Sequence, residues 1–267
     1  MIPYSGPPSL TVFGLTFHAF GFLVASGVIS GYHYILARAA KIGYPEPEVK
    51  KAMATVLLFG FPISHVFEIV FYHQDRLSAE GPLLLLKVWD GISSYGGFLG
   101  AVIGFLWFIT TIPRERVWVV GDLLIQGLLI GWLFGRLGCT LVMDHPGEIT
   151  DFFLGFQMPG GARHNLGFYE FLFTLFVLMP AAWLTVKKQA RPGMLVALTS
   201  ALYAPVRFAL DSMRASGGIH DETRYGGLTP AQYVSVVLFV YSLYLVKTLK
   251  PGNAARVASL KNAGERS

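Results

Sequence analysis

The chain has 267 residues, of which 53% are hydrophobic and 14% charged, and its mean hydropathy of +0.52 excludes an ordinary water-soluble domain. The formal net charge of +5 at pH 7 does not indicate a nucleic-acid partner, because the positive residues are sorted by loop as in membrane proteins. A single cysteine excludes an internal disulfide.

Apolar stretches recur along the chain, and each is long enough to cross about 30 Å of hydrocarbon. We expect an all-α polytopic membrane protein with seven transmembrane helices, formed by one domain over residues 1–250 and a short polar cytoplasmic tail over 251–267. No Lys or Arg precedes the first stretch, so we expect a retained span and not a secretory signal peptide. The predicted spans cover residues 12–36, 52–72, 92–112, 118–143, 166–186, 193–213 and 229–248.

Lysine and arginine concentrate in alternate connections between these spans. The connections rich in Lys and Arg, together with the tail, carry Arg38, Lys41, Lys50, Lys51, Arg114, Arg116, Lys187, Lys188, Arg191, Lys247, Lys250, Arg256, Lys261 and Arg266. The remaining connections carry only Arg76, Lys87, Arg163, Arg214 and Arg224. The positive-inside rule therefore predicts an N-terminus outside and a C-terminus in the cytoplasm.

Glycines recur at four-residue spacing in the third and fourth predicted spans. They are Gly96, Gly100, Gly104, Gly127, Gly131 and Gly135. Such a stripe lets two helices approach closely, so we interpret it as a packing feature.

Most ionisable residues inside the spans fall in the outer leaflet. Arg136 and Arg207 each lie roughly 10 Å below the outer end of their spans, at 1.5 Å per residue. A charge deep in a membrane costs at least about 2.5 kcal/mol when uncompensated, so each arginine needs a partner or a function. Asp211 follows Arg207 by one helical turn, whereas Asp144 lies about 80° around the helix from Arg136 and is a poorer partner.

Two interpretations of these arginines remain open. They pair with carboxylates only to fix helix packing, or they form an anion site facing the outer leaflet. The planar guanidinium fork suits phosphate, and two forks in an apolar cavity suit a phospholipid headgroup whose acyl chains stay in the lipid.

Five ordered motifs run over nearly the whole chain. They are VWDGISSYGGFLG at 88–100, GRLG at 135–138, RHNLGFYE at 163–170, YAPVRFALDSMR at 203–214 and LTPAQ at 228–232. Together they resemble the motifs of the prolipoprotein diacylglyceryl transferase family, whose signature begins Gly-Arg-x-Gly. Five matches in order are far more specific than any single one.

This resemblance implies a multi-pass enzyme of the bacterial inner membrane, with its active site toward the outer leaflet. Such an enzyme transfers the diacylglyceryl group of phosphatidylglycerol to the lipobox cysteine of a preprolipoprotein, forming a thioether and releasing glycerol phosphate. The expected partners are phosphatidylglycerol, the lipobox peptide and the lipid bilayer. No metal and no cofactor are expected.

The resemblance also assigns site residues. Arg136 and Arg207 would hold the phosphate, with Asp211 orienting Arg207. The expected catalytic residues are Arg136, Arg207, Tyr95, Asp144 and His145. The expected substrate-binding residues are Asp211, His164, Tyr169, Glu170, Gly138, Cys139 and His65.

Several positions depart from the family pattern and mark a divergent member. A family tyrosine is replaced by Phe20, an arginine by His65, a histidine by Tyr95, an asparagine by Cys139 and a glutamate by Asp144. The usual general base is thereby absent, and His145 or His164 are candidates to replace it, with Tyr95 as a hydrogen-bond donor.

Three classes of function remain. The first is the lipid transferase, the second a transporter or lipid-binding protein that uses the arginine pocket without chemistry, and the third a catalytically silent accessory relative. Cys139 is interpreted as a small packing residue and not as a nucleophile. Asp144 and His145 lack metal-ligand spacing and are interpreted as a turn at the outer rim.

Overall fold

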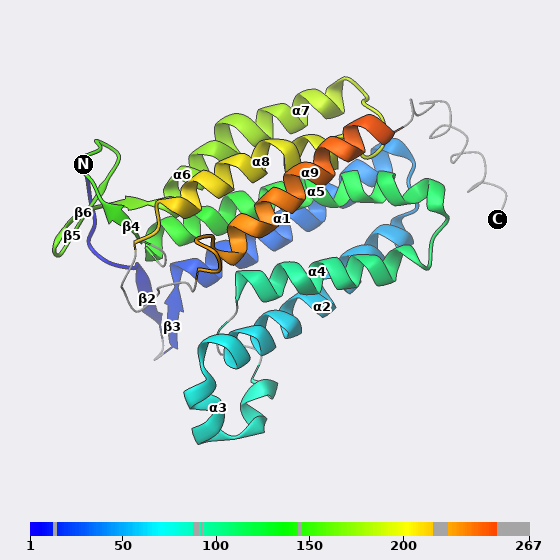
Figure 1. Cartoon of the computed structure of the whole chain (residues 1–267). Helices are drawn as coiled ribbons and strands as arrows, with labels where there is room; N and C mark the ends of the chain where they lie inside the picture. The colour runs from blue at the N-terminus through cyan, green and yellow to red at the C-terminus, as the bar shows by residue number, and fades with distance from the viewer. Residues whose placement is uncertain (13–14, 88–90, 92, 144–145, 216–223, 250–267) are drawn as a thin grey trace. The chain divides into compact units, whose positions relative to one another are not determined.

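A computed structural model describes residues 1–12, 15–87, 91, 93–143, 146–215 and 224–249 (Figure 1). Asp144, His145 and the predicted tail at 251–267 lie outside these residues. The described chain forms two compact units, one from 1–35 and 121–249 and the other from 36–120. The prediction of one membrane domain stays a prediction.

Six helical segments among the described residues are long and apolar enough to cross a membrane. They are α1 (Ala19–Ile42), α2 (Glu46–Tyr72), α5 (Arg114–Val142), the continuous segment Leu166–Lys187, α8 (Met194–Ser212) and α9 (Pro230–Thr248). The segment Leu166–Lys187 consists of α6 (Leu166–Phe173), a π-helical turn η2 (Thr174–Leu178) and α7 (Met179–Lys187). The chain is therefore a multi-pass membrane protein.

The third predicted span corresponds to α4 (Ser94–Ile109), which has 16 residues. At 1.5 Å per residue it is about 24 Å long, shorter than a hydrocarbon core of about 30 Å. That the chain crosses the membrane seven times, and in which direction, stays a prediction.

The predicted start of the first span at residue 12 is wrong, because α1 begins at Ala19. The preceding residues form an antiparallel pair, β2 (Ser9–Val12) with β3 (Leu15–His18), in which Ser9 lies opposite His18. Apolar composition alone did not separate a strand from a helix here, since both can present such a run.

A small sheet, absent from the sequence prediction, connects α5 to α6. Its strand order is β1 (Ile2–Pro3), β5 (Phe156–Met158), β6 (Gly161–Asn165) and β4 (Pro146–Ile149), with β1 parallel to β5 and the other pairs antiparallel. Gly160 and Gly161, with φ of 90° and 119°, close the turn between β5 and β6. These strands are too short for a clear alternating pattern, which explains why they were missed.

In the second unit, α4 packs along α2 through the predicted glycine stripe. A Cβ atom on Gly96 would lie 2.8 Å from the Ile63 carbonyl oxygen, and one on Gly104 would lie 2.6 Å from the Thr55 carbonyl oxygen. Only glycine permits this approach, so the packing interpretation is confirmed for this stripe. Two short helices, α3 (Gln74–Glu80) and η1 (Pro82–Leu86), follow α2.

In the first unit, α1 and α5 approach at two glycine pairs. A Cβ atom on Gly31 would lie 2.7 Å from the Gly127 carbonyl oxygen, and Gly27 faces Gly131. Gly135, by contrast, has open space around the position of a Cβ atom, so it does not extend the stripe.

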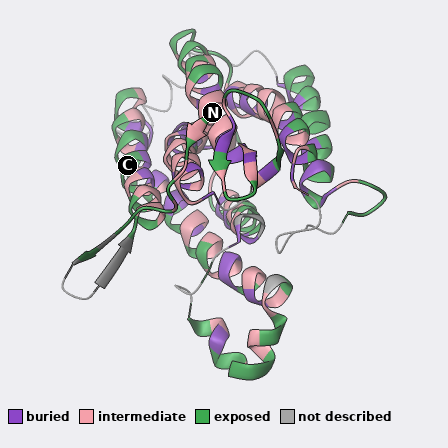
Figure 2. Cartoon of the chain, turned by 90° about the vertical axis from the view of Figure 1, so that its left-hand side faces the viewer, coloured by how far each residue is buried: buried purple, intermediate pink, exposed green. Residues whose placement is uncertain are grey.

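The outward faces of the helices carry exposed residues, many of them large and apolar (Figure 2). On α9, Val234, Val237 and Val240 are each 60% or more exposed. Exposed aliphatic faces of this kind fit contact with lipid tails, as expected for a membrane-embedded helix.

Candidate functional site

Arg136 and Arg207 meet at a single buried carboxylate, that of Glu170. The Arg136 Nε atom lies 2.5 Å from Glu170 Oε2, and Arg207 Nη1 donates a hydrogen bond of 2.9 Å to Glu170 Oε1. Glu170 is 1% exposed. The sequence analysis did not identify Glu170 as this partner, although it placed the ionisable residues of the spans in one leaflet.

Three helices bring these groups together at corresponding ends. Arg136 lies six residues before the end of α5, Arg207 five before the end of α8, and Glu170 four after the start of α6. The three residues therefore lie roughly 6 to 9 Å from the ends of their helices, at 1.5 Å per residue. Within the first unit they thus lie at corresponding distances from the helix ends, and their depth in the membrane stays a prediction.

Aromatic side chains surround Arg136. Its guanidinium carbon lies 4.1 Å from the centre of the Trp132 ring, and the Trp132 and Tyr203 rings pack edge to face with centroids 5.6 Å apart. A guanidinium over an indole face is stabilised by the ring quadrupole, more so where water is excluded. Trp132 thus fixes the direction of Arg136 from one helical turn earlier on α5.

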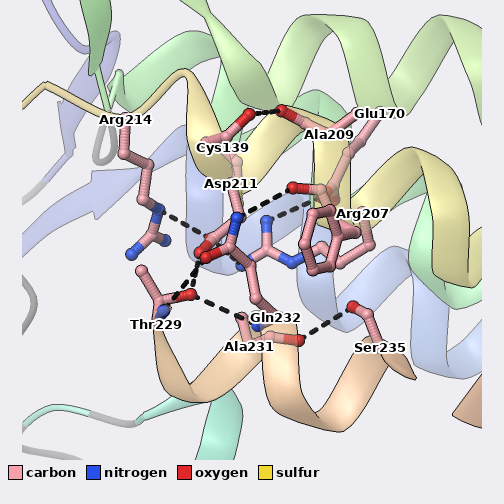
Figure 3. A network of polar contacts seen from close by, with 12 residues as sticks. Cys139, Glu170, Arg207, Ala209, Asp211, Arg214, Thr229, Ala231, Gln232 and Ser235 are labelled. Atoms are coloured by element: carbon pink, nitrogen blue, oxygen red, sulfur yellow. Dashed lines mark hydrogen bonds and ion pairs between the residues drawn. The ribbon is translucent and has the colours of Figure 1, made fainter. Parts of the chain in front are cut away.

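Asp211 forms a second charged centre beside Arg207 (Figure 3). Its Oδ1 atom lies 3.1 Å from Arg207 Nη2 and 3.2 Å from Arg214 Nε, and its Oδ2 atom accepts a hydrogen bond from the Thr229 hydroxyl. Asp211 is fully buried. The predicted contact between Asp211 and Arg207 is present, and its role in orienting the arginine stays a proposal.

Thr229, the residue before α9, contacts Asp211, and Gln232 in the first turn of α9 contacts Thr229; neither was predicted as a site residue. The Thr229 side chain accepts from the Gln232 backbone N–H, and the Gln232 side chain accepts from the Thr229 backbone N–H, which forms a capping box. Gln232 Nε2 also donates to the Phe208 carbonyl on α8 at 3.3 Å. The spacing Thr-x-x-Gln before an apolar run is the sequence signal that could have identified this helix start.

Cys139 and Gly138 lie where α5 contacts its neighbours. A Cβ atom on Gly138 would lie 2.9 Å from the Phe20 ring, and one on Gly167 would lie 2.9 Å from Cys139 Cβ. The half-buried Cys139 thiol lies 3.9 Å from Arg136 Nη1, one helical turn earlier on α5. Both positions show tight packing, and their predicted part in substrate binding stays a prediction.

His164 and Tyr169 form a separate polar pair. His164 Nδ1 and the Tyr169 hydroxyl are 2.8 Å apart, and both rings contact the Phe152 ring. Burial lowers the pKa of His164 from its ordinary value, an effect partly opposed by Glu148. In the described part of the chain, neither residue forms an ion pair or hydrogen bond with the two arginines.

His65 and Tyr95 belong to the second unit. His65 is fully buried, with Nδ1 3.0 Å from the Gly91 carbonyl oxygen and Nε2 3.0 Å from the Leu84 carbonyl oxygen. Tyr95 lies in the first turn of α4. His65 thus joins α2 to the segment that precedes α4.

The charged cluster carries a formal net positive charge. It contains three guanidinium groups and two carboxylates, which leaves an excess of one positive charge. Guanidinium groups bind carboxylates and phosphates, so the cluster has the chemistry of an anion site.

The family model of prolipoprotein diacylglyceryl transferase matches residues 7–248 of this chain. The chain belongs to the prolipoprotein diacylglyceryl transferase family. The family match includes the arginine cluster, strands β4 to β6 of the sheet and most of both units.

Curated relatives are similar over almost their entire length. The phosphatidylglycerol--prolipoprotein diacylglyceryl transferase of Nitratidesulfovibrio vulgaris (strain Miyazaki F) is 26% identical over 91% of this chain and 94% of its own. The proteins of the same name from Solidesulfovibrio magneticus and Chromohalobacter salexigens are 25% and 26% identical, over 95% and 91% of this chain and 98% and 92% of their own. At this identity the chain is a divergent member of the transferase family.

Proposed function

We propose that the protein transfers the diacylglyceryl group of phosphatidylglycerol to the lipobox cysteine of a preprolipoprotein, with formation of a thioether and release of glycerol phosphate. The observation that carries this proposal is the convergence of two guanidinium groups, from α5 and α8, on one buried anionic position. The names of the relatives support the same reaction.

Arg136 and Arg207 are proposed to bind the phosphate of the lipid. The leaving glycerol phosphate gains negative charge as the carbon–oxygen bond breaks, and donors fixed in a site of low dielectric stabilise that charge strongly. Trp132 and Asp211 hold the two arginines in place, so little reorganisation is needed when the phosphate arrives.

We place the site toward the outer leaflet of the bacterial inner membrane, with the N-terminus outside and seven crossings. The positive residues in alternate connections support this orientation, since cytoplasmic loops are enriched in Lys and Arg. Lipobox peptides would reach the site from the leaflet in which the lipid acyl chains remain. Tyr95, Asp144, His145, His164 and Tyr169 stay candidates for contacts with either substrate.

The reaction is tested with purified protein, phosphatidylglycerol and a lipobox peptide, with thioether formation followed by mass spectrometry. Arg136→Ala and Arg207→Ala should each lower the rate by at least about 100-fold, as expected for loss of a donor to a developing charge. Lysine at either position should recover the rate only in part, because an ammonium keeps the charge and loses the fork. Arg114→Ala, at the exposed opposite end of α5, is the matched control.

A second candidate function is an accessory lipid-binding protein without catalysis. The pairing of both arginines with Glu170 favours it, because a closed ion-pair network also stabilises helix packing without any substrate. Binding of labelled phosphatidylglycerol with no thioether under any condition would establish this alternative and exclude the transferase. Solute flux in liposomes, insensitive to lipobox peptide, would instead indicate transport.

A further inference from the structure

We propose that Glu170 holds Arg136 and Arg207 until the lipid phosphate displaces its carboxylate, and that the displaced carboxylate then accepts the proton of the acceptor thiol. This inference rests on the proposed transfer reaction. It names Glu170 as the general base that the sequence departures leave unassigned.

The contacts of Glu170 are those that a phosphate would replace. Among the described residues its two oxygens contact only the two guanidinium groups, at 2.5 and 2.9 Å. Glu170 Oε2 has no partner with hydrogen-bond geometry, so its contact with Arg136 is an ion pair without a directional hydrogen bond. A phosphodiester presents two anionic oxygens, as the carboxylate does, and guanidinium groups bind such oxygens in bidentate fashion.

Asp211, the other carboxylate of the cluster, also has partners other than Arg136 and Arg207. It contacts Arg207 and Arg214 through Oδ1 and accepts from the Thr229 hydroxyl through Oδ2. A phosphate that binds Arg136 and Arg207 leaves the contacts with Arg214 and Thr229 intact. Glu170 is therefore the carboxylate that phosphate binding frees.

A freed Glu170 carboxylate has the chemistry that the acceptor thiol requires. A cysteine thiol with an ordinary pKa near 8.5 is mostly protonated at neutral pH, and the thiolate is the nucleophile. A buried carboxylate that has lost its counter-ions gains affinity for a proton. Release from the arginines thus converts Glu170 from an ion-pair partner into a base at the moment when the lipid is bound.

The step is balanced in atoms and charge. The thiol proton passes to Glu170, the sulfur forms a bond to the terminal glyceryl carbon, and the bond from that carbon to the phosphate oxygen breaks with its electron pair on oxygen. The three arginines, Asp211, Glu170 and a phosphodiester are together neutral before transfer. They are neutral afterward as well, because protonation of Glu170 offsets the second negative charge on glycerol phosphate, so no net charge develops in the buried site.

The inference is tested with Glu170→Gln, which keeps the size of the side chain and removes the base. Phosphatidylglycerol binding should be unchanged or tighter, whereas thioether formation at pH 7 should fall roughly 30-fold, because only about 3% of a thiol with a pKa near 8.5 is ionised there. The remaining rate should rise about tenfold per pH unit up to about pH 8.5, because only spontaneously ionised peptide thiol reacts. A selenocysteine acceptor peptide, whose selenol is ionised at neutral pH, should restore the rate.

Matched variants distinguish a role of Glu170 as general base from a role in packing. Glu46→Gln removes a carboxylate from an exposed ion pair with Lys50 and should change neither binding nor rate. Glu170→Asp keeps a base at a shorter reach and should lower the rate without introducing the steep pH dependence. The unfolding midpoint of each variant in detergent shows whether it is folded.

The outcomes distinguish this inference from the proposed reaction. Absence of thioether with the unaltered protein overturns both. An active unaltered protein with Glu170→Gln within about threefold of its rate, or with an unchanged pH slope and no recovery by selenocysteine, overturns the assignment of the base alone. Parallel loss of lipid binding and rate in Glu170→Gln shows that the carboxylate only organises the arginines, and likewise overturns it.

Discussion

The Thr229 hydroxyl forms hydrogen bonds with groups of two helices, α8 and α9. Its removal should therefore lower the free energy of unfolding by more than the loss of a helix cap alone. The hydroxyl donates to Asp211 Oδ2 on α8 and accepts from the Gln232 backbone N–H at the start of α9. Thr229→Val keeps the shape of the side chain and removes both interactions. The residue is 1% exposed, so water cannot replace them.

The expected loss follows from two separate contributions. Loss of an N-cap typically costs about 1 kcal/mol. Loss of a hydrogen bond between helices in a membrane protein costs about 0.6 to 1.7 kcal/mol, and the charged acceptor favours the upper part of that range. Thr229→Val should therefore lower the free energy of unfolding by about 2 kcal/mol, as measured by titration with a denaturing detergent.

Two further substitutions at this position separate the contributions. Thr229→Ser keeps the donor and the cap and should lie within about 0.5 kcal/mol of the unaltered protein. Thr229→Asp keeps a good cap but sets a second carboxylate against Asp211, so it should be at least as destabilising as valine. Equal stability of the valine variant and the unaltered protein would refute the dual role, as would a stable aspartate variant.

Three other predictions concern stability, and each is measured by unfolding in detergent. Asp122→Ala should cost about 2 kcal/mol, because the Asp122 carboxylate accepts from two backbone N–H groups at the start of α8, at 2.8 and 3.1 Å; a cost below about 0.5 kcal/mol would contradict this. Gly104→Ala should cost about 1 to 3 kcal/mol, since its Cβ atom would collide with the Thr55 carbonyl oxygen, whereas Gly135→Ala meets open space and should be nearly neutral. Burial lowers the pKa of His164 below its ordinary 6.5, so as the pH falls the unfolded chain binds a proton at this histidine before the folded chain does. The contribution of His164 to the free energy of unfolding should therefore be complete above about pH 6.5 and decline below it. His164→Gln should flatten this decline.

Hydropathy identified most of the helices because lipid leaves a spanning backbone few alternatives. The fourth span was predicted at 118–143 and α5 covers Arg114–Val142, while the last was predicted at 229–248 and α9 covers Pro230–Thr248. The error lies at the start of the first span, where residues 15–18 pair as a strand. Near the membrane ends, backbone groups can be satisfied by a neighbouring strand, and composition no longer decides the structure.

The candidate site was predicted as a set of residues in one leaflet, and apart from the Arg207–Asp211 pair its contacts were not predicted. Periodicity along one helix revealed Arg207 and Asp211, because residues four apart share a face. Glu170 lies 37 residues from Arg207, and its contact with both arginines depends on how α5, α6 and α8 are rotated against one another. No local pattern encodes that rotation.

The sheet between α5 and α6 explains how that rotation is fixed. Asn165, the last residue of β6, accepts from the Phe168 backbone N–H and so caps α6, while its amide donates to the Thr140 carbonyl in the last turns of α5. One buried side chain therefore sets both the start of α6 and its position along α5. Glu170 lies five residues after this point and Arg136 four residues before Thr140, so each is about one helical turn away on its own helix. Since a small error in that register would separate the carboxylate from the guanidinium, the sheet acts as the element that aligns the charged cluster.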